Sequence, residues 1–120
     1  MADEITIIPY IKVTKSGATY ERATASISVT MTGDAWQTGV QEIGTSAENI
    51  VKGDVSTVGW CYFKNLDSTN YIEIGFDDTG FVTFLKLKPG EAAICRLSQD
   101  VPQAKADTGA CDLEYAIIED

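Results

Sequence analysis

The residues of this chain that come closest to a chemical site are three nearby carboxylates, Glu73, Asp77 and Asp78. A hairpin could gather them as hard oxygen ligands for calcium. However, the run Asp77-Asp78-Thr79-Gly80 has the composition of an ordinary β-turn, in which aspartate side chains cap nearby amides. The alternating acidic pattern of a calcium-binding loop is absent. We therefore expect a turn here, and we expect neither a metal nor another cofactor.

The chain contains no histidine, which excludes Ser-His-Asp and Cys-His arrangements. Among eighteen acidic residues, two that could act as the paired carboxylates of a glycosidase can always be chosen. Such a choice is therefore no specific evidence for glycosidase activity. Cys61, Cys95 and Cys111 lack the spacing of a zinc site, and their apolar surroundings predict buried free thiols. A disulfide between two of them is the less favoured alternative in a reducing compartment. We expect a protein that is not an enzyme.

The second half of the chain is organised as short apolar runs separated by turns rich in Asp, Asn and Gly. We expect strands at Gly59–Asn65, Tyr71–Phe76, Phe81–Leu87, Ala92–Leu97 and Cys111–Glu119, with a loop over Gln99–Gly109. Many short strands at such regular spacing predict an antiparallel sandwich or barrel. Lys88-Pro89-Gly90-Glu91 predicts a tight turn, because proline presets φ and glycine tolerates positive φ.

The first half is less regular. A β-branched run over Glu4–Val13 predicts a strand, and Pro9 places it at a sheet edge or bulge because proline has no amide donor. Period-two alternation predicts a half-buried strand over Ala23–Met31. Within the poorly patterned Thr32–Val58 we expect a strand near Trp36 and a short helical turn over Ser46–Val51. We predict one domain over 1–120, all-β with at most one short helix, with 1–13 as a possible extended arm.

Charge and composition exclude several partners. Nine basic and eighteen acidic residues give a net charge of −9, which opposes binding to nucleic acid and to anionic membranes. No apolar stretch approaches the length of a membrane-spanning helix. The beginning, Met1-Ala2-Asp3-Glu4, has neither the basic nor the apolar region of a secretory signal. We expect the chain to be synthesised and folded in a cytoplasm.

Most aromatic side chains lie within strand runs and are expected in the core. Trp36 is the exception, because it lies in the polar segment Gly33-Asp34-Ala35-Trp36-Gln37. Exposed tryptophans are frequent anchors of protein interfaces. An N-terminal edge strand could also pair with a neighbouring subunit. We therefore expect contacts with partners at Ile5, Ile7, Pro9, Tyr10 and Trp36.

Four segments resemble small virion proteins found in the structural gene blocks of tailed bacteriophages. These segments are Phe63–Gly75, Leu87–Glu91, Ala104–Thr108 and Asp112–Glu119. The resemblance implies a β-sandwich, often jelly-roll-like, and carries no catalytic residues. It also implies a decoration (cement) protein that stabilises the capsid, binds the major capsid protein and forms a homo-oligomer, by analogy a trimer, on the virion surface.

Two other functions fit the same residues. A tail or head–tail joining component would also be structural, but would be present in far fewer copies. A carbohydrate-binding adhesion module would expose an aromatic platform. These alternatives differ in copy number on particles and in the response of tryptophan fluorescence to sugars.

Overall fold

The computed structural model describes residues 3–98 and 101–120 of the chain. These residues form strands and turns without any helix, as the all-β prediction requires. Contacts divide the chain into two units, Met1–Thr32 and Gly33–Asp120. Among the described residues no helix is long and apolar enough to cross a membrane.

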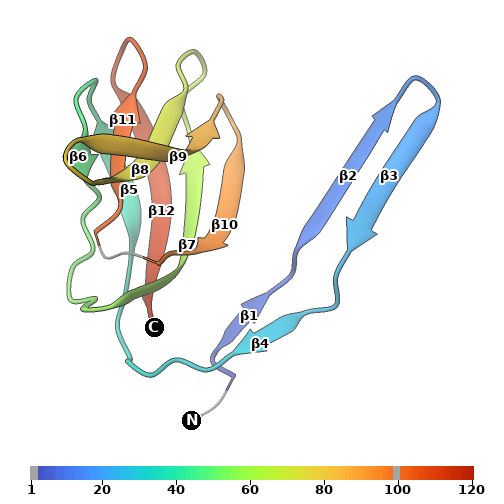
Figure 1. The fold of residues 1–120 in the computed structure, drawn as a ribbon, viewed down its shortest axis with the longest axis horizontal. Coiled ribbons are helices and arrows are strands. Elements are labelled where there is room, and N and C mark those ends of the chain that lie inside the picture. Colours follow the sequence, from blue (N-terminus) through green and yellow to red (C-terminus); the bar gives the residue numbers. More distant parts are fainter. Residues whose placement is uncertain (1–2, 99–100) are drawn as a thin grey trace. The chain divides into compact units, whose positions relative to one another are not determined.

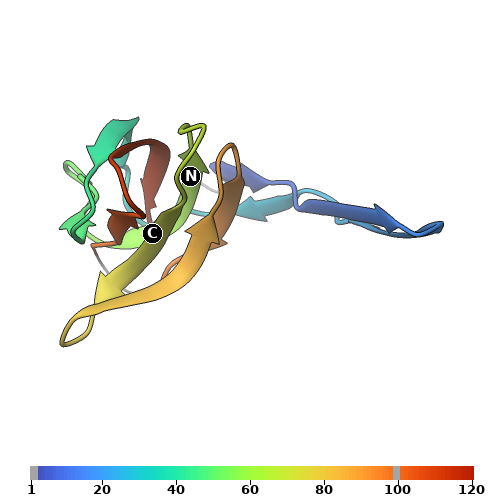
Figure 2. The same ribbon diagram turned by 90° about the horizontal axis from the view of Figure 1, so that it is seen from above.

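The unit Gly33–Asp120 is a sandwich of two four-stranded antiparallel sheets (Figures 1 and 2). Sheet I has the order β10-β7-β12-β5, and its strands are Ala92–Arg96, Val58–Asn65, Cys111–Glu119 and Trp36–Ile43. Sheet II has the order β6-β11-β8-β9, and its strands are Glu48–Asn49, Gln103–Ala106, Ile72–Asp77 and Phe81–Leu87.

The strand order makes this sandwich a jelly roll. The eight strands pair from the outside inward along the chain: β5 with β12, β6 with β11, β7 with β10, and β8 with β9. The resulting ribbon folds over, so that β12 also pairs with β7 and β11 with β8. Eight strands in two such sheets define the jelly-roll architecture. The prediction of a jelly-roll-like sandwich is confirmed.

Alternating side chains of both sheets form the core. On β12, Cys111, Leu113, Tyr115 and Ile117 are buried, while Asp112 and Glu114 between them are exposed. Period-two burial is the pattern of a strand with one face on the core. Sheet I contributes most of the bulk, and sheet II adds smaller and branched residues opposite it. The buried cluster consists of Ile43, Ile50, Val55, Val58, Cys61, Phe63, Ile72, Ile74, Leu87, Ala104, Ala106, Cys111, Leu113, Tyr115 and Ile117.

Two predictions within this unit are wrong. Ser46–Val51 contains the short strand β6 rather than a helical turn, and the expected loop Gln99–Gly109 contains β11. The two segments pair with each other, since Gln103 lies opposite Asn49. Short strands of this kind carry too few residues to show a periodicity of their own, so the pairing partner determines their conformation.

Backbone geometry at two glycines explains local irregularities. Gly90 has φ of 82°, and the Glu91 amide donates to the Lys88 carbonyl at 2.9 Å, which confirms the predicted tight turn. Gly75 lies where the register of β8 and β9 shifts, and a Cβ there would lie within 1.9 Å of the Val82 carbonyl oxygen. Only glycine permits so close an approach of two backbones.

The unit Met1–Thr32 contains two antiparallel ribbons. One pairs β1 (Ile5–Ile7) with β4 (Ile27–Val29), and the other pairs β2 (Tyr10–Lys15) with β3 (Ala18–Ala23). The single strand expected over Glu4–Val13 is therefore divided into β1 and β2. The half-buried strand expected over Ala23–Met31 is wrong, because β3 ends at Ala23 and β4 covers only Ile27–Val29, with Ile27 39% exposed. Proline lacks the amide that a ladder needs, so the first strand breaks at Pro9, whose carbonyl still accepts from the Thr24 amide at 3.1 Å.

Candidate interaction surfaces

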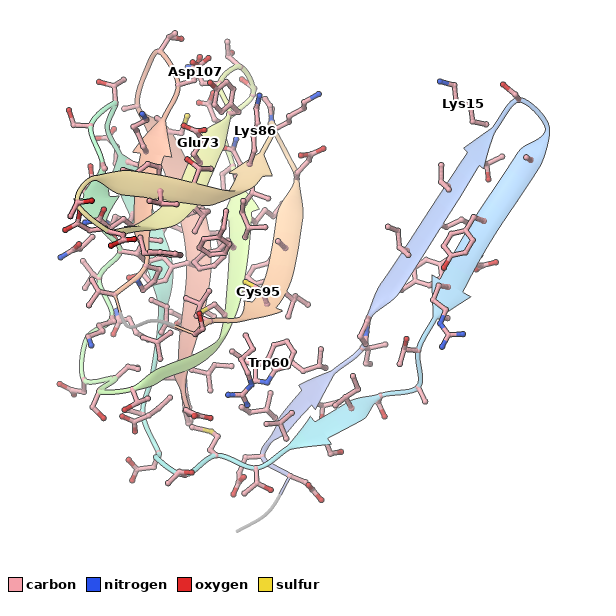
Figure 3. All side chains as sticks on the ribbon, in the orientation of Figure 1. Lys15, Trp60, Glu73, Lys86, Cys95 and Asp107 are labelled. Atoms are coloured by element: carbon pink, nitrogen blue, oxygen red, sulfur yellow. The ribbon has the colours of Figure 1, made fainter. Side chains whose placement is uncertain are left out.

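The ribbon Tyr10–Ala23, called here the hairpin arm, exposes every residue of its two strands to solvent. Its strands are joined by Ser16-Gly17, whose φ angles of 53° and 80° are those of a type I′ hairpin turn. The exposed side chains include large apolar ones, with exposed fractions of 53–62% for Ile11, Val13 and Tyr20. Lys15 lies at the turn end of β2 (Figure 3). A two-stranded ribbon whose residues are all exposed is marginally stable in water by itself, so this segment is suited to binding.

The register gives the hairpin arm two unlike faces, because residues directly opposite each other share a face. One face combines the pairs Ile11–Arg22, Val13–Tyr20 and Lys15–Ala18. This face, called here the basic apolar face, has two cations and no acidic residue. The other face combines Tyr10–Ala23, Lys12–Glu21 and Thr14–Thr19. The two faces therefore differ in both hydrophobicity and charge.

The second face of the hairpin arm satisfies its own polar groups. The Tyr10 hydroxyl donates to Glu21 Oε2 at 2.6 Å, and the hydroxyls of Thr14 and Thr19 lie 3.2 Å apart. The hydrogen bond to Glu21 raises the pKa of Tyr10. Because these polar groups form hydrogen bonds within the arm, they do not need hydrogen bonds from a partner. The basic apolar face is thus the side of the arm that a partner would cover.

A second apolar surface lies on the outer face of sheet I. The register aligns Ile94, Tyr62, Ala116 and Thr38 in one row across all four strands. Val40 and Trp36 extend the apolar surface along β5, with exposed fractions of 58% and 66%. An antiparallel sheet usually presents a polar outer face. Contiguous exposed apolar residues mark sites of interaction.

Acidic residues border this outer face. Asp112 on β12 and Glu42 on β5 lie directly opposite each other and are both exposed. Like charges in direct cross-strand positions destabilise a sheet unless a cation neutralises them. Glu114 follows on the same face and lies opposite Lys64 of β7. Of these acidic residues, Asp112 and Glu42 form the pair that a cation from a partner would neutralise.

Sheet II has a row of charged residues on its outer face around Glu73. Glu73 of β8 lies between Lys105 of β11 and Lys86 of β9 in the register, and Lys105 Nζ is 4.0 Å from Glu73 Oε1. Lys86 also lies 4.1 Å above the centre of the Tyr71 ring. Glu73 and Lys86 appear near each other in Figure 3. These charges are paired on their own sheet, which is the usual state of a solvated surface.

An open hollow of about 510 Å³ adjoins Trp36. Its lining is mostly polar and consists of Asp34, Ala35, Trp36, Gln37, Asp54 and Glu119. The indole of Trp36 is the only aromatic ring among these residues. A flat apolar ring beside carboxylates and an amide can hold a ligand that has both an apolar face and hydroxyl groups.

Glu119 forms one wall of this hollow and holds its backbone in place. Its carboxylate accepts from the amides of Asp34 and Ala35 at 3.1 and 3.3 Å, and from the Ser56 amide at 2.7 Å. The Ser56 hydroxyl also donates to it. These bonds, the Ser56 hydroxyl first, lower the pKa of Glu119 to about 2. The carboxylate has a structural role, tying the start of β5 and the Ser56 loop to the end of β12.

The five residues expected to contact partners differ in accessibility. Ile5 and Ile7 on β1 are buried, with exposed fractions of 7% and 8%. Pro9, Tyr10 and Trp36 are exposed, with exposed fractions of 58% for Tyr10 and 66% for Trp36. Pro9 and Tyr10 lie at the base of the hairpin arm, and Trp36 lies at the edge of sheet I. The segment around Ile11, Val13 and Tyr20 was not among the expected contacts.

The residues first considered for chemistry take up structural positions. Asp77 Oδ1 accepts from the Gly80 amide at 3.0 Å, which confirms the β-turn over 77–80. Within residues 3–98 and 101–120, no three potential ligands gather into a metal site. The three cysteines are free, with Cys61 and Cys111 buried and Cys95 half-buried. Burial, with a smaller effect of Cys95, raises the pKa of Cys61 to about 12.

The aromatic residues are less buried than expected. Only Phe63 and Tyr115 lie in the buried core among the described aromatic residues. Trp60 and Tyr62 face outward from β7, where Arg96 lies 5.6 Å from the Trp60 ring and forms an ion pair with Asp120 at 2.8 Å. Strand sequences that alternate two kinds of apolar residue do not reveal which face is inward.

Searches among protein-family models, curated proteins and solved structures found no match to this chain.

Proposed function

We propose that this chain is a structural virion protein that decorates and stabilises the capsid of a tailed bacteriophage. The observation that carries the proposal is the hairpin arm, which exposes apolar side chains along its whole length. An element of this kind gains stability only when a partner covers it. A jelly roll by itself is shared by capsid proteins, lectins and cupins, so the fold is compatible with the proposal but does not select it.

The partner in this proposal is the major capsid protein, and the chain acts as a homo-oligomer, a trimer by analogy. Pro9, Tyr10 and Trp36 are the exposed residues through which the shell is contacted. Repetition over a symmetric particle makes many weak contacts act together. The net charge of −9 keeps unbound copies soluble and apart from nucleic acid.

Quantitative mass spectrometry of purified particles tests this function. The proposal predicts about as many copies of this chain as of the major capsid protein. A handful of copies would indicate a tail or head–tail joining component instead, and absence from particles would contradict a virion role.

Attachment can be tested with variants. Deleting residues 2–10 removes β1 and the base of the hairpin arm, and Trp36→Ser removes the exposed indole. Both variants should co-sediment with undecorated capsids less than the unmodified chain does. Val82→Ser, which removes an exposed apolar residue from sheet II, is the matched control and should bind normally. Equal binding by all variants would contradict these contacts.

A second candidate function is carbohydrate binding, which the hollow beside Trp36 favours. Titration with mono- and oligosaccharides should then shift tryptophan fluorescence. Trp36→Phe should abolish the shift, and Trp60→Phe should retain it, because Trp60 does not line the hollow. A chain that serves only as a shell protein should show no sugar-dependent shift in either variant.

A further inference from the structure

We infer that the basic apolar face of the hairpin arm binds a second copy of this chain, on the outer face of its sheet I. The inference deepens the homo-oligomer part of the proposed function, and it names the surfaces that meet. It requires no shell, so it can be tested with the purified chain.

Both surfaces expose large apolar side chains. Ile11, Val13 and Tyr20 share one face of the arm, and their side chains are more than half exposed. On sheet I, Ile94 and Val40 are likewise more than half exposed on the outer face. Covering both surfaces removes apolar area from water, which favours association. A partner with only a polar surface would not provide this gain.

The arm and the sandwich carry opposite net charges. The hairpin arm carries three basic residues and one acidic residue, a net charge of +2. Residues 33–120 carry fifteen acidic and six basic residues, a net charge of −9. Two arms would repel each other, and so would two acidic sandwiches. The combination of arm with sandwich is the one that opposite charge favours.

The spacing between charged and apolar residues is the same on the two surfaces. On β2, Lys15 follows Val13 by two residues on the basic apolar face. On β5, Glu42 follows Val40 by two residues on the outer face, with Asp112 directly opposite it. Each step corresponds to about 7 Å along a strand. When the two strands run in the same direction, apolar contact between Val13 and Val40 brings Lys15 toward Glu42 and Asp112.

Such a contact joins two different surfaces, so it is heterologous. Heterologous contacts form closed rings when the rotation between copies closes, and filaments when it does not. The two-faced arm also explains why its other side pairs its own polar groups, since that side makes no contact with the second copy. Lys12 lies on this other side, where it is opposite Glu21.

The test is sedimentation velocity of the full chain over a concentration series. The unmodified chain should form oligomers, and Lys15→Glu should weaken self-association at least about tenfold, because it places a like charge near Glu42 and Asp112. Lys12→Glu is the matched control: it makes the same charge change on the same strand but on the other face, and should leave association unchanged. Circular dichroism checks that both variants are folded.

Charge reversal on the other surface completes the test. Glu42→Lys combined with Asp112→Lys should also weaken association, and adding Lys15→Glu to that variant should restore it. An unmodified chain that remains monomeric throughout the series would overturn the inference, as would equal effects of Lys12→Glu and Lys15→Glu. Capsid co-sedimentation of the same variants distinguishes this inference from the proposed function. Loss of shell binding with intact self-association would count against the proposed function alone, and loss of self-association with intact shell binding would count against this inference alone.

Discussion

The jelly roll and the hairpin arm are both built of antiparallel strands, but the two regions differ in how far their side chains are buried. In β12 every second residue is buried against sheet II, whereas in β2 and β3 no residue is buried. The jelly roll is stabilised by its core. Of its eight strands, only the outer strands β5, β10, β6 and β9 have an edge that is not paired within the sheets. The arm has the hydrogen bonds of a hairpin without a core. Strand content alone therefore does not show which part of a chain forms a core and which part is available for binding.

The largest expected effect is in the core of the jelly roll. Phe63 is fully buried on β7, so Phe63→Ala should lower the free energy of unfolding by about 3–5 kcal/mol. Tyr20→Ala in the hairpin arm should change the stability of the monomer by no more than about 0.5 kcal/mol. Urea titration at low protein concentration measures both. Similar losses in the two variants would show that the arm packs like core.

A buried asparagine gives the next largest effect. Asn65 Nδ2 donates to the carbonyls of Asn70 and Leu87 at 2.9 and 3.0 Å, and its Oδ1 accepts from the Asp67 amide at 2.9 Å. Asn65→Ala leaves these groups without their partner, and should cost about 2–4 kcal/mol. Asn49→Ala, at an exposed asparagine, is the control and should cost about 0.5 kcal/mol or less. A near-neutral Asn65→Ala would mean that water replaces these bonds.

Acid should weaken the jelly roll through Glu119. Its pKa in the folded chain is about 2 and its ordinary value is 4.5, so the carboxylate stabilises the fold above about pH 4.5. That contribution is lost as the pH falls from about 4.5 toward 2. Glu119→Gln should be less stable at neutral pH and should lose less stability over this acidic range. Glu114→Gln, at an exposed glutamate, is the control. Parallel pH profiles for Glu119→Gln and the unmodified chain would contradict this role.

The smallest effect concerns thiol reactivity. With a pKa of about 12, Cys61 is a thiolate in about one molecule in ten thousand at pH 8. A thiol-reactive probe should therefore modify Cys61 slowly in the folded chain and rapidly in urea. Peptide mapping by mass spectrometry identifies the modified cysteine. Equal rates in the folded and unfolded chain would show that the core around β7 and β10 opens readily.

The sequence allowed much of the jelly roll to be predicted, since Phe81–Leu87 and Cys111–Glu119 were expected at the bounds observed. β6 and β11 were missed because strands of two and four residues are determined by their partners rather than by their own patterns. Trp36 was expected to be exposed because of its polar neighbours, and it is. The exposure of Ile11, Val13 and Tyr20 could not be predicted, because an apolar strand has the same sequence whether or not something covers it.

Hydrogen exchange of the full chain at low and high protein concentration tests whether the hairpin arm is an open surface that a second copy covers. Amides of the core strands β7 and β12 should be protected at both concentrations. Amides of the hairpin arm should exchange quickly in the dilute chain and become protected as concentration rises, together with those of the sheet I edge strand β5. Arm protection that is already high in the dilute chain, or that never rises with concentration, would contradict the claim that the arm is an open surface for a second copy.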